Sequence, residues 1–404
     1  MANLGKKWGA VLACWAVALV LVIAGICMGL VIPSSAADEY KYEGDIRVEF
    51  DADKNGVIDE TETKTYHSFI EALTAIKEFN TTAENQATIK LLSDVSLVNL
   101  QDGAFGFLIN AKHITIDLNG HYLRDAVGYY GESNNTVTTF FNVHCNGSLT
   151  FIDSDPTALH YCSFNSGKGV YTFSDTPEIG EPNTPVRGGI IAAQAMMFYV
   201  GANDGYDDQA FGGTINFNAG TYVAKIGAMQ LVANAHVVIE DGVTWQVNMD
   251  ATELGIEDAT AGTKVAMFVV NGGPYDYGDS TLTINGGTIY GEVYCMNMRE
   301  GGNDPHNPYV TDMERVDLTK ERNDGVIKVK GNMKKVEIED GVYAYTSADE
   351  DAGTTPNKPI ADANSTNDNN NLIALIVLGA AAAVMVVGVA VIIILNNKRR
   401  KKVA

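Results

Sequence analysis

Short phrases that alternate apolar and polar residues recur along the chain and predict strands. The clearest runs from Ser280 to Tyr290 as STLTINGGTIY, an alternating segment followed by a glycine turn and a second alternating segment. Alternation with a period of two and β-branched residues predicts a strand, and Asn-Gly-Gly predicts a tight turn. Related phrases occupy residues 87–95, 113–123, 148–153, 213–223, 237–245 and 336–343. The region 87–345 is therefore predicted to be all-β.

The turn glycines of these phrases are regularly spaced. Gly220, Gly242 and Gly286 are 22 and 44 residues apart, which we interpret as one and two steps of a 22-residue repeat. A repeat of this length is typical of a solenoid, in which each unit buries its apolar face against the next at a spacing of about 4.8 Å. We predict that residues 87–345 form a parallel β-helix. A pair of β-sandwiches, which also uses short alternating strands, is the competing fold.

One segment ahead of the strands predicts a helix. Apolar residues within 68–79 recur at helical spacing, and Ser68 with Glu71 has the pattern of a capping box. Because the open end of a stacked sheet needs cover, we expect this helix to lie over the end of the β-helix. Residues 38–86 are accordingly predicted to form an N-terminal cap.

The strand phrases and their turns resemble those of a known family. The helix at 68–79, the phrase at 87–95, the sequence ITIDLNG at 114–120 and the Gly-Gly-Thr and Glu-Asp-Gly-Val turns are similar to those of right-handed parallel β-helix, pectate-lyase-like surface proteins, especially adhesin-like proteins of gut bacteria and archaea. The resemblance covers roughly residues 65–345 and lies in architectural motifs. It implies a right-handed parallel β-helix ectodomain. It also implies two functions: an adhesin-like protein that binds without catalysis, or a polysaccharide lyase or glycoside hydrolase.

A first apolar run predicts export of the chain. Residues 8–32 are almost wholly apolar, follow two lysines and precede the small residues Ser35 and Ala37. This pattern predicts that residues 1–37 are a signal peptide cleaved after Ala37, and an uncleaved signal anchor is the alternative. Both alternatives place residue 38 and its successors outside the cell.

A second apolar run predicts a membrane anchor. Residues 372–395 are 24 uncharged residues, long enough to cross a bilayer as a helix, and the alternative is a buried core helix. The basic tail 396–404 predicts a cytoplasmic C-terminus. The polar segment 346–371 has no apolar period and is predicted to be a disordered stalk. The chain is thus expected to be a single-pass protein of the cell membrane with residues 38–371 extracellular.

The charge of the chain limits its partners. The net charge is −22; residues 1–37 contribute +2 and residues 372–404 contribute +5, so residues 38–371 carry −29. An exterior this acidic repels polyanions, and nucleic acid is therefore excluded as a partner.

The cysteines do not predict a disulfide scaffold. Of the five in the chain, Cys145, Cys162 and Cys295 lie between the apolar runs, and three is an odd number. A bridge between Cys145 and Cys162 is one interpretation, and three small buried side chains are the other.

The segment Asp51–Glu62, DADKNGVIDETE, resembles the twelve-residue calcium loop of an EF-hand. Oxygen ligands alternate along such a loop, a glycine makes its sharp turn and a final glutamate closes it. The resemblance implies a calcium site with the ligand residues Asp51, Asp53, Asn55, Val57, Asp59 and Glu62. Residues 45–50 depart from the family pattern because they alternate like a strand rather than a helix. A β-hairpin with an acidic turn is therefore the alternative.

Four carboxylates are the candidates for catalysis. Asp153 and Asp155 form either a general acid–base pair or an Asp-Ser-Asp-Pro turn. Asp207 and Asp208 resemble the Asp-Asp element of hydrolases with this fold. The arginines of residues 38–371 are not clustered, and its acidic charge opposes the anionic substrate of a lyase.

Polar insertions between the strand phrases are the candidates for binding. They occupy 124–137, 155–187, 200–211, 246–262 and 296–325 and are rich in Gly, Asn, Asp and Tyr, as at Tyr129–Tyr130 and Tyr206–Asp208. Tyr275–Tyr277, just ahead of the phrase at 280–290, has the same character. Loops on a rigid scaffold often carry binding residues, and these side chains suit sugars, although each insertion equally fits a solvated loop. We expect an adhesin-like protein that binds a glycan or a surface partner without catalysis, with a membrane-tethered carbohydrate-active enzyme as the alternative.

Overall fold

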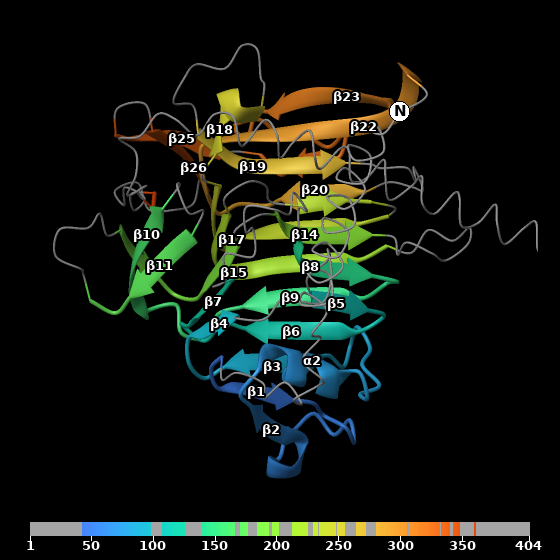
Figure 1. The fold of residues 1–404 in the computed structure, drawn as a ribbon, viewed down its shortest axis with the longest axis vertical. Coiled ribbons are helices and arrows are strands. Elements are labelled where there is room, and N and C mark those ends of the chain that lie inside the picture. The colour runs from blue at the N-terminus through green and yellow to red at the C-terminus, as the bar shows by residue number, and fades with distance from the viewer. Residues whose placement is uncertain are drawn as a thin grey trace, which may run out of the picture. The chain divides into compact units, whose positions relative to one another are not determined.

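Strands dominate the computed structural model of this chain (Figure 1). The structure describes residues 43–97, 107–125, 139–165, 170–176, 184–193, 196–201, 212–224, 229–232, 234–247, 249–254, 264–271, 280–304, 307–331, 333–339, 342–347 and 359–360. Over these residues the chain is mostly β with large parallel sheets, as expected for the all-β class.

Three sheets contain the strands of the described residues. Sheet A has fifteen strands: β1 (Ile46–Glu49), β2 (Thr63–Tyr66), β3 (Ala87–Leu91), β4 (Val95–Leu97), β6 (His113–Asp117), β7 (Tyr122–Asp125), β9 (Ser148–Ile152), β13 (Ile190–Ala193), β15 (Thr214–Ala224), β17 (His236–Val247), β20 (Thr281–Ile284), β21 (Thr288–Tyr290), β24 (Ile327–Val329), β25 (Lys334–Glu339) and β26 (Val342–Thr346). Sheet B has eight: β5 (Phe107–Asn110), β8 (Thr139–His144), β14 (Met196–Gly201), β16 (Met229–Leu231), β18 (Met249–Asp250), β19 (Lys264–Asn271), β22 (Glu292–Asp304) and β23 (Asn307–Val316). Sheet C has three: β10 (Leu159–Asn165), β11 (Val170–Ser174) and β12 (Thr184–Arg187). The helical elements are α2 (Phe69–Ile76) and the 3₁₀ turns η1 (Glu60–Glu62) and η2 (Ala251–Leu254).

Three ladders of parallel strands run through sheets A and B. Ladder 1 joins β3, β6, β9, β15, β17, β20 and β24. Ladder 2 joins β4, β7, β13, β15, β17 and β21. Ladder 3 joins β5, β8, β14, β16, β19 and β22. Within each ladder the strands follow in chain order, and Figure 1 shows them stacked with colours running from blue to orange.

Aromatic side chains in register form the centre of the core. Phe151 of β9 pairs with Phe217 of β15, and their rings stack with centroids 5.4 Å apart. Phe141 of β8 pairs with Phe198 of β14, and these rings stack at 5.8 Å. All four side chains are fully buried. Burying an aromatic side chain of this size contributes ~1.5–3 kcal/mol to stability, so the ladders are held together from inside as well as by their backbone hydrogen bonds.

The repeat period differs from the sequence prediction in one step. Thr214 pairs with His236, 22 residues later, and His236 pairs with Thr281, 45 residues later. Because β17 pairs directly with β20, the longer spacing is a single step that contains β18, η2 and β19, and its interpretation as two repeats is wrong. Strand pairing fixes only the residues of the strands, so an inserted segment changes the sequence spacing without changing the ladder.

Antiparallel strands lie at both ends of the ladders. At the N-terminal end, β1 pairs antiparallel with β2 and β3. At the other end, β23 pairs antiparallel with β22, and β26 pairs antiparallel with β21 and β25. The expectation that residues 336–343 form a further parallel unit is wrong, because Val336 turns back to pair with Ala344 in the hairpin β25–β26. Similarly, the insertion expected at 296–325 contains most of the hairpin β22–β23.

The predicted helix forms, but its N-terminus is bonded differently from the prediction. Residues Phe69, Ala72, Leu73 and Ile76 of α2 are buried, and the Phe69 ring lies 4.9 Å from that of Phe107 at the start of ladder 3. The Ser68 side chain makes no capping hydrogen bond. The buried carboxylate of Glu43 instead accepts the Phe69 N–H at 2.9 Å. The capping-box prediction is therefore wrong, because a residue distant in sequence satisfies the first amide of the helix.

Sheet C covers a second apolar cluster beside sheet A. The insertion expected as a polar loop at 155–187 contains all three of its strands, which pair antiparallel. The buried members of the cluster are Cys162, Phe164, Tyr171, Val186, Ile190, Ala192, Val223 and Ile360. The Gln246 side chain donates to the Ile360 carbonyl at 3.0 Å and accepts the Ile360 N–H at 2.9 Å. The chain is thus held at Ile360, a residue of the predicted stalk 346–371, because its side chain is buried in this cluster.

The cysteines between the apolar runs are not in disulfides, so the interpretation of a Cys145–Cys162 bridge is wrong. Cys162 and Cys295 are buried, and Cys145 is half-buried. Burial raises the pKa of the Cys295 thiol to about 12, which keeps it protonated.

The predicted membrane runs 8–32 and 372–395 lie outside the described residues. Within the part of the chain that is described, no helix is long and apolar enough to span a bilayer.

Candidate functional site

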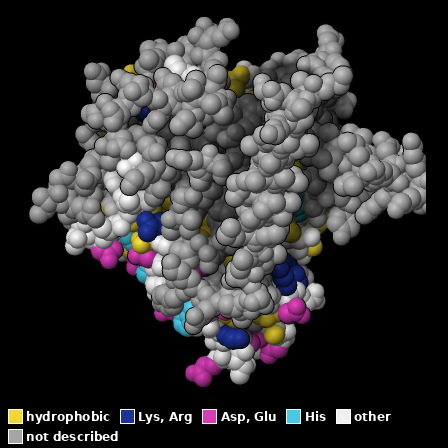
Figure 2. Space-filling model, in the orientation of Figure 1, with side chains coloured by type: hydrophobic (Ala, Val, Ile, Leu, Met, Phe, Trp, Pro, Cys, Tyr) yellow, Lys and Arg dark blue, Asp and Glu magenta, His cyan; other side chains and the backbone are white. Residues whose placement is uncertain are grey.

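The calcium-like loop connects two strands. β1 and β2 pair antiparallel from Ile46 with Tyr66 to Glu49 with Thr63. The N–H of Phe50 donates to the Glu62 carbonyl at 3.1 Å and closes the base of the loop. Residues 51–62 therefore form the tip of a hairpin, and the strand-like pattern of the residues before them is confirmed. Figure 2 shows Asp and Glu side chains exposed at the end of the molecule where this hairpin lies.

Three of the predicted ligand residues converge in the loop. Asp51, Asp53 and Glu62, at positions 1, 3 and 12, each offer a carboxylate oxygen, and these oxygens lie within 4.8 Å of one another. Gly56 N–H donates to Asp51 Oδ2 at 2.7 Å, and Asn55 N–H donates to Asp53 Oδ1 at 3.0 Å. Gly56 has a φ of +80°, which favours glycine at the sharp turn. Backbone amides thus hold the carboxylates on the inside of the loop.

Glu62 ties the end of the loop to its beginning. Its Oε1 accepts the N–H of Ala52 at 2.6 Å, and its Oε2 accepts the N–H of Asp59 at 3.3 Å. Asp59 Oδ1 in turn accepts the Thr61 hydroxyl and N–H, both at 2.7 Å. These hydrogen bonds from Thr61 lower the pKa of Asp59, so this carboxylate stays ionised.

The remaining two predicted ligands, Asn55 and Val57, are bonded to each other. Asn55 Oδ1 accepts the Val57 N–H at 2.7 Å, and Val57 is exposed, as are most residues of the loop. Calcium takes six to eight oxygen ligands and tolerates irregular geometry. Three converging carboxylates that solvent can reach fit this ion, with Asn55, the Val57 carbonyl and water available to complete its shell.

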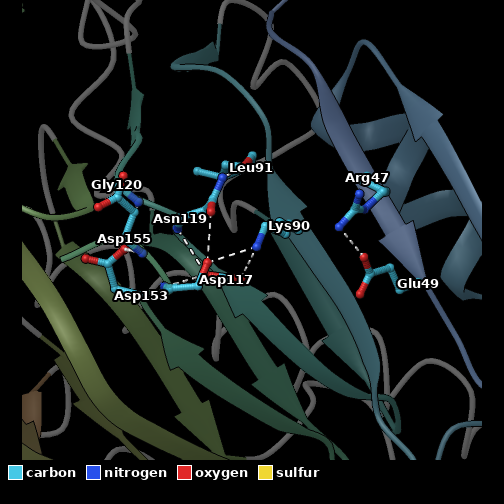
Figure 3. Close-up of polar contacts among 10 residues, drawn as sticks. Arg47, Glu49, Lys90, Leu91, Asp117, Asn119, Gly120, Asp153 and Asp155 are labelled. Atoms are coloured by element: carbon cyan, nitrogen blue, oxygen red, sulfur yellow. Dashed lines mark hydrogen bonds and ion pairs between the residues drawn. The ribbon is translucent and has the colours of Figure 1, made fainter. Parts of the chain in front are cut away.

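The carboxylate of Asp153 is bonded to the backbone of two other segments, and Figure 3 shows the first of these at Gly120. Its Oδ1 accepts the N–H of Gly120 at 2.7 Å, and its Oδ2 accepts the N–H of Gly189 at 2.7 Å. A Cβ atom at Gly188 would lie only 2.4 Å from Asp153 Oδ2, so the close approach requires glycine at that position. Asp153 therefore joins the turn after β6 to the segment that enters β13.

The neighbouring Asp155 caps its own turn. Its Oδ1 accepts the Thr157 hydroxyl at 2.7 Å and the Thr157 N–H at 3.2 Å. These hydrogen bonds from Thr157 lower the pKa of Asp155, an exposed carboxyl group. A general acid needs a carboxyl group with a raised pKa, so that it holds a proton near neutral pH, whereas the pKa of Asp155 is lowered.

Asp117 and Asn119, which the sequence reasoning missed, extend this network along ladder 1. Asp117 lies 3.1 Å from Lys90 Nζ on β3 and accepts the N–H of Ser154 after β9 at 2.9 Å. The Asn119 side chain donates to the Leu91 carbonyl at 2.9 Å. Figure 3 shows Lys90, Leu91, Asp117 and Asn119 close together on neighbouring segments. The signal in the sequence was an aspartate at the end of an alternating apolar segment, at 117 and at 153.

The other sequence candidates lie outside the described residues. These candidates are Asp207 and Asp208, and the tyrosines at 129, 130, 206, 275 and 277. Comparison of the chain with protein-family models, with curated proteins and with solved structures found no match.

Proposed function

We propose that this chain is a membrane-anchored extracellular protein, adhesin-like, that binds a glycan or a surface partner without catalysis. Its ectodomain in this proposal is a right-handed parallel β-helix. The three ladders support the β-helix, because successive segments of the chain add strands to them in order. Support for the anchor comes from the apolar runs 8–32 and 372–395 and the basic tail.

One observation carries the non-catalytic part of the proposal. Both oxygens of Asp153 accept short hydrogen bonds from backbone amides, of Gly120 and Gly189. A carboxylate in that position stabilises the turn, which is the role that the turn interpretation predicts. The turn interpretation of Asp153 and Asp155 is thereby favoured over the acid–base pair. The enzyme alternative then rests on Asp207 and Asp208.

Calcium has a structural role in this proposal. The loop 51–62 joins β1 to β2, and β1 pairs with β3, the first strand of ladder 1. An ion bound by Asp51, Asp53 and Glu62 would fix the hairpin that covers this sheet edge. Binding to the folded form alone would raise stability as calcium concentration rises above its dissociation constant.

A glycan array with the full-length chain in detergent, with and without calcium, tests the function. Product analysis follows on each glycan that binds. We expect the chain to bind a glycan on the array and to release no oligosaccharide from it. Release that is lost in Asp153→Asn or Asp208→Asn, and kept in the exposed-carboxylate control Asp324→Asn, would establish the enzyme instead.

Alkaline extraction of membranes tests the anchor. The full-length chain should stay in the membrane pellet, and a variant that consists of residues 38–371 alone should not. Extraction of the full-length chain into the soluble fraction would refute the anchor while leaving the binding function open.

A further inference from the structure

Three side chains from separate segments converge where sheet C meets the turns of sheet A. Asp94 lies between β3 and β4, His160 lies on β10, and Asp175 follows β11. One ligand atom of each residue lies within 4.8 Å of the other two. No short motif relates these positions, so only the fold brings them together.

The ring of His160 is oriented by its hydrogen bond to the backbone. Its Nε2 lies 2.6 Å from the carbonyl oxygen of Gly120. A carbonyl oxygen only accepts, so Nε2 carries the hydrogen, and in the neutral ring Nδ1 then carries the lone pair. A histidine that donates one ring nitrogen to a backbone carbonyl is the arrangement that positions metal ligands in proteins.

The other ring nitrogen is buried and unsatisfied. His160 is 4 % exposed, and among the described residues its Nδ1 has no hydrogen-bond partner. The closest anionic atom recorded for it is Asp175 Oδ1, at 3.8 Å, too far for a hydrogen bond. A buried nitrogen without a partner costs free energy, and a cation between Nδ1 and the carboxylates would remove that cost.

The two carboxylates differ in how they are held. Asp94 Oδ1 accepts the N–H of Tyr122 and lies 3.2 Å from His121 Nδ1, so this group is oriented by its neighbours. The Asp175 side chain is 83 % exposed and is free to turn toward an ion that arrives from solvent. One fixed and one adjustable carboxylate beside a fixed imidazole make a site that is built on one side and open on the other.

Tyr122, on β7, packs beside the three side chains. The Tyr122 ring lies edge-on to the His160 ring at 5.8 Å and forms one wall. The Arg124 guanidinium lies over the rings of Tyr122 and Phe173. It donates hydrogen bonds to the Ser96 hydroxyl and to the Tyr171 carbonyl.

We propose that Asp94, His160 and Asp175 bind a divalent transition-metal ion of the Zn²⁺ or Co²⁺ type. An imidazole nitrogen with two carboxylate oxygens suits these ions, whereas calcium prefers oxygen alone. Water fills the remaining positions on the exposed side. The ion joins sheet C to the turn between β3 and β4, and this site is independent of the loop 51–62 and of the proposed function.

Titration of the metal-free full-length chain in detergent with Co²⁺ tests the site. The readouts are the visible absorption of protein-bound Co²⁺ and the heat of binding, with Zn²⁺ displacing the Co²⁺. Asp175→Asn changes an exposed side chain and should leave folding unchanged. His160→Gln removes the nitrogen ligand. Controls are Glu62→Gln, in the other candidate site, and His236→Gln, at an exposed histidine.

We expect one bound Co²⁺ in the wild type and in both controls, and affinity lower by roughly 10- to 100-fold or more in Asp175→Asn and His160→Gln. Failure of the wild type to bind overturns the proposal. Equal binding in the wild type, Asp175→Asn and His160→Gln overturns it as well. A loss of stability in metal-free Asp175→Asn with no metal effect in the wild type would assign the cluster to a histidine–aspartate ion pair.

Discussion

The side-chain oxygen Oδ2 of Asp153 accepts the backbone N–H of Gly189 at 2.7 Å, across 36 residues of sequence. The segment between them contains sheet C, so this bond returns the chain to the stack after its largest described insertion. The absence of a side chain at Gly188 allows the carboxylate to approach the backbone so closely. Asp153 is thus a structural residue of the turn.

Replacement of Asp153 should cost stability. In Asp153→Asn only one side-chain oxygen remains, so at least one of the amides of Gly120 and Gly189 loses its acceptor. We expect the free energy of unfolding to fall by ~1–3 kcal/mol, measured by urea denaturation. Asp155→Asn, at an exposed site, should change it by less than ~1 kcal/mol. Equal effects of the two substitutions would show that Asp153 does not hold the turn.

Acid should destabilise the protein through His144. Burial lowers the pKa of His144 to about 4 from 6.5, and neither ring nitrogen has a hydrogen-bond partner among the described residues. The unfolded chain therefore binds more protons than the folded chain between these values. The stability that neutral His144 provides is complete above pH 6.5 and is lost as the pH falls to about 4, by up to ~3 kcal/mol.

The variant His144→Phe isolates this effect, because it keeps a ring beside Tyr199 and cannot titrate. Denaturation in urea at a series of pH values should give a flatter curve for His144→Phe than for the wild type between pH 6.5 and 4. His236→Phe, at an exposed histidine, should follow the wild type. Parallel curves for His144→Phe and the wild type would remove His144 as the cause.

Docking of the C-terminal segment should depend on Gln246. Its side chain makes two hydrogen bonds to the backbone of Ile360, which is itself buried in the cluster under sheet C. Loss of ~1.4 kcal/mol of hydrogen bonding in Gln246→Ala should speed amide exchange at Ile360 about tenfold, measured by hydrogen–deuterium exchange. Gln86→Ala, at a residue bonded to the nearby Ala83 carbonyl, is the control. An unchanged exchange rate at Ile360 would mean that the segment is held by other contacts.

The strands were predictable because their information is local. The phrases at 148–153 and 213–223 become β9 and β15, with the alternating side chains Leu149, Phe151, Ile215 and Phe217 buried as the pattern indicates. The step from Gly242 to Gly286 was misinterpreted because a ladder constrains strands and leaves insertions free. The direction of β26 was also hidden, because an antiparallel end strand has the same alternation as a parallel one.

The candidate sites also differ in whether the sequence could predict them. The loop Asp51–Glu62 is contiguous, and its motif was readable from the sequence, including the strand that precedes it. The partners of Asp153 lie at 120 and 189, and the cluster of Asp94, His160 and Asp175 spans three segments. Tertiary contacts of this kind have no signature in local spacing. The Phe69 N–H shows this most simply, since Glu43 rather than the neighbouring Ser68 accepts it.

Calorimetric titration of the full-length chain with calcium, at physiological salt to screen the acidic surface, tests the calcium loop most directly. We compare the wild type with Glu62→Gln, which weakens the ligand at position 12, and with Glu60→Gln, an exposed neighbour outside the converging carboxylates. His160→Gln serves as a second control, because it lies in the separate cluster. We predict a saturable one-site heat in the wild type, Glu60→Gln and His160→Gln, and an affinity lower by about tenfold or more in Glu62→Gln. Absence of heat in the wild type, or an unchanged isotherm in Glu62→Gln, would contradict a calcium site at Asp51, Asp53 and Glu62.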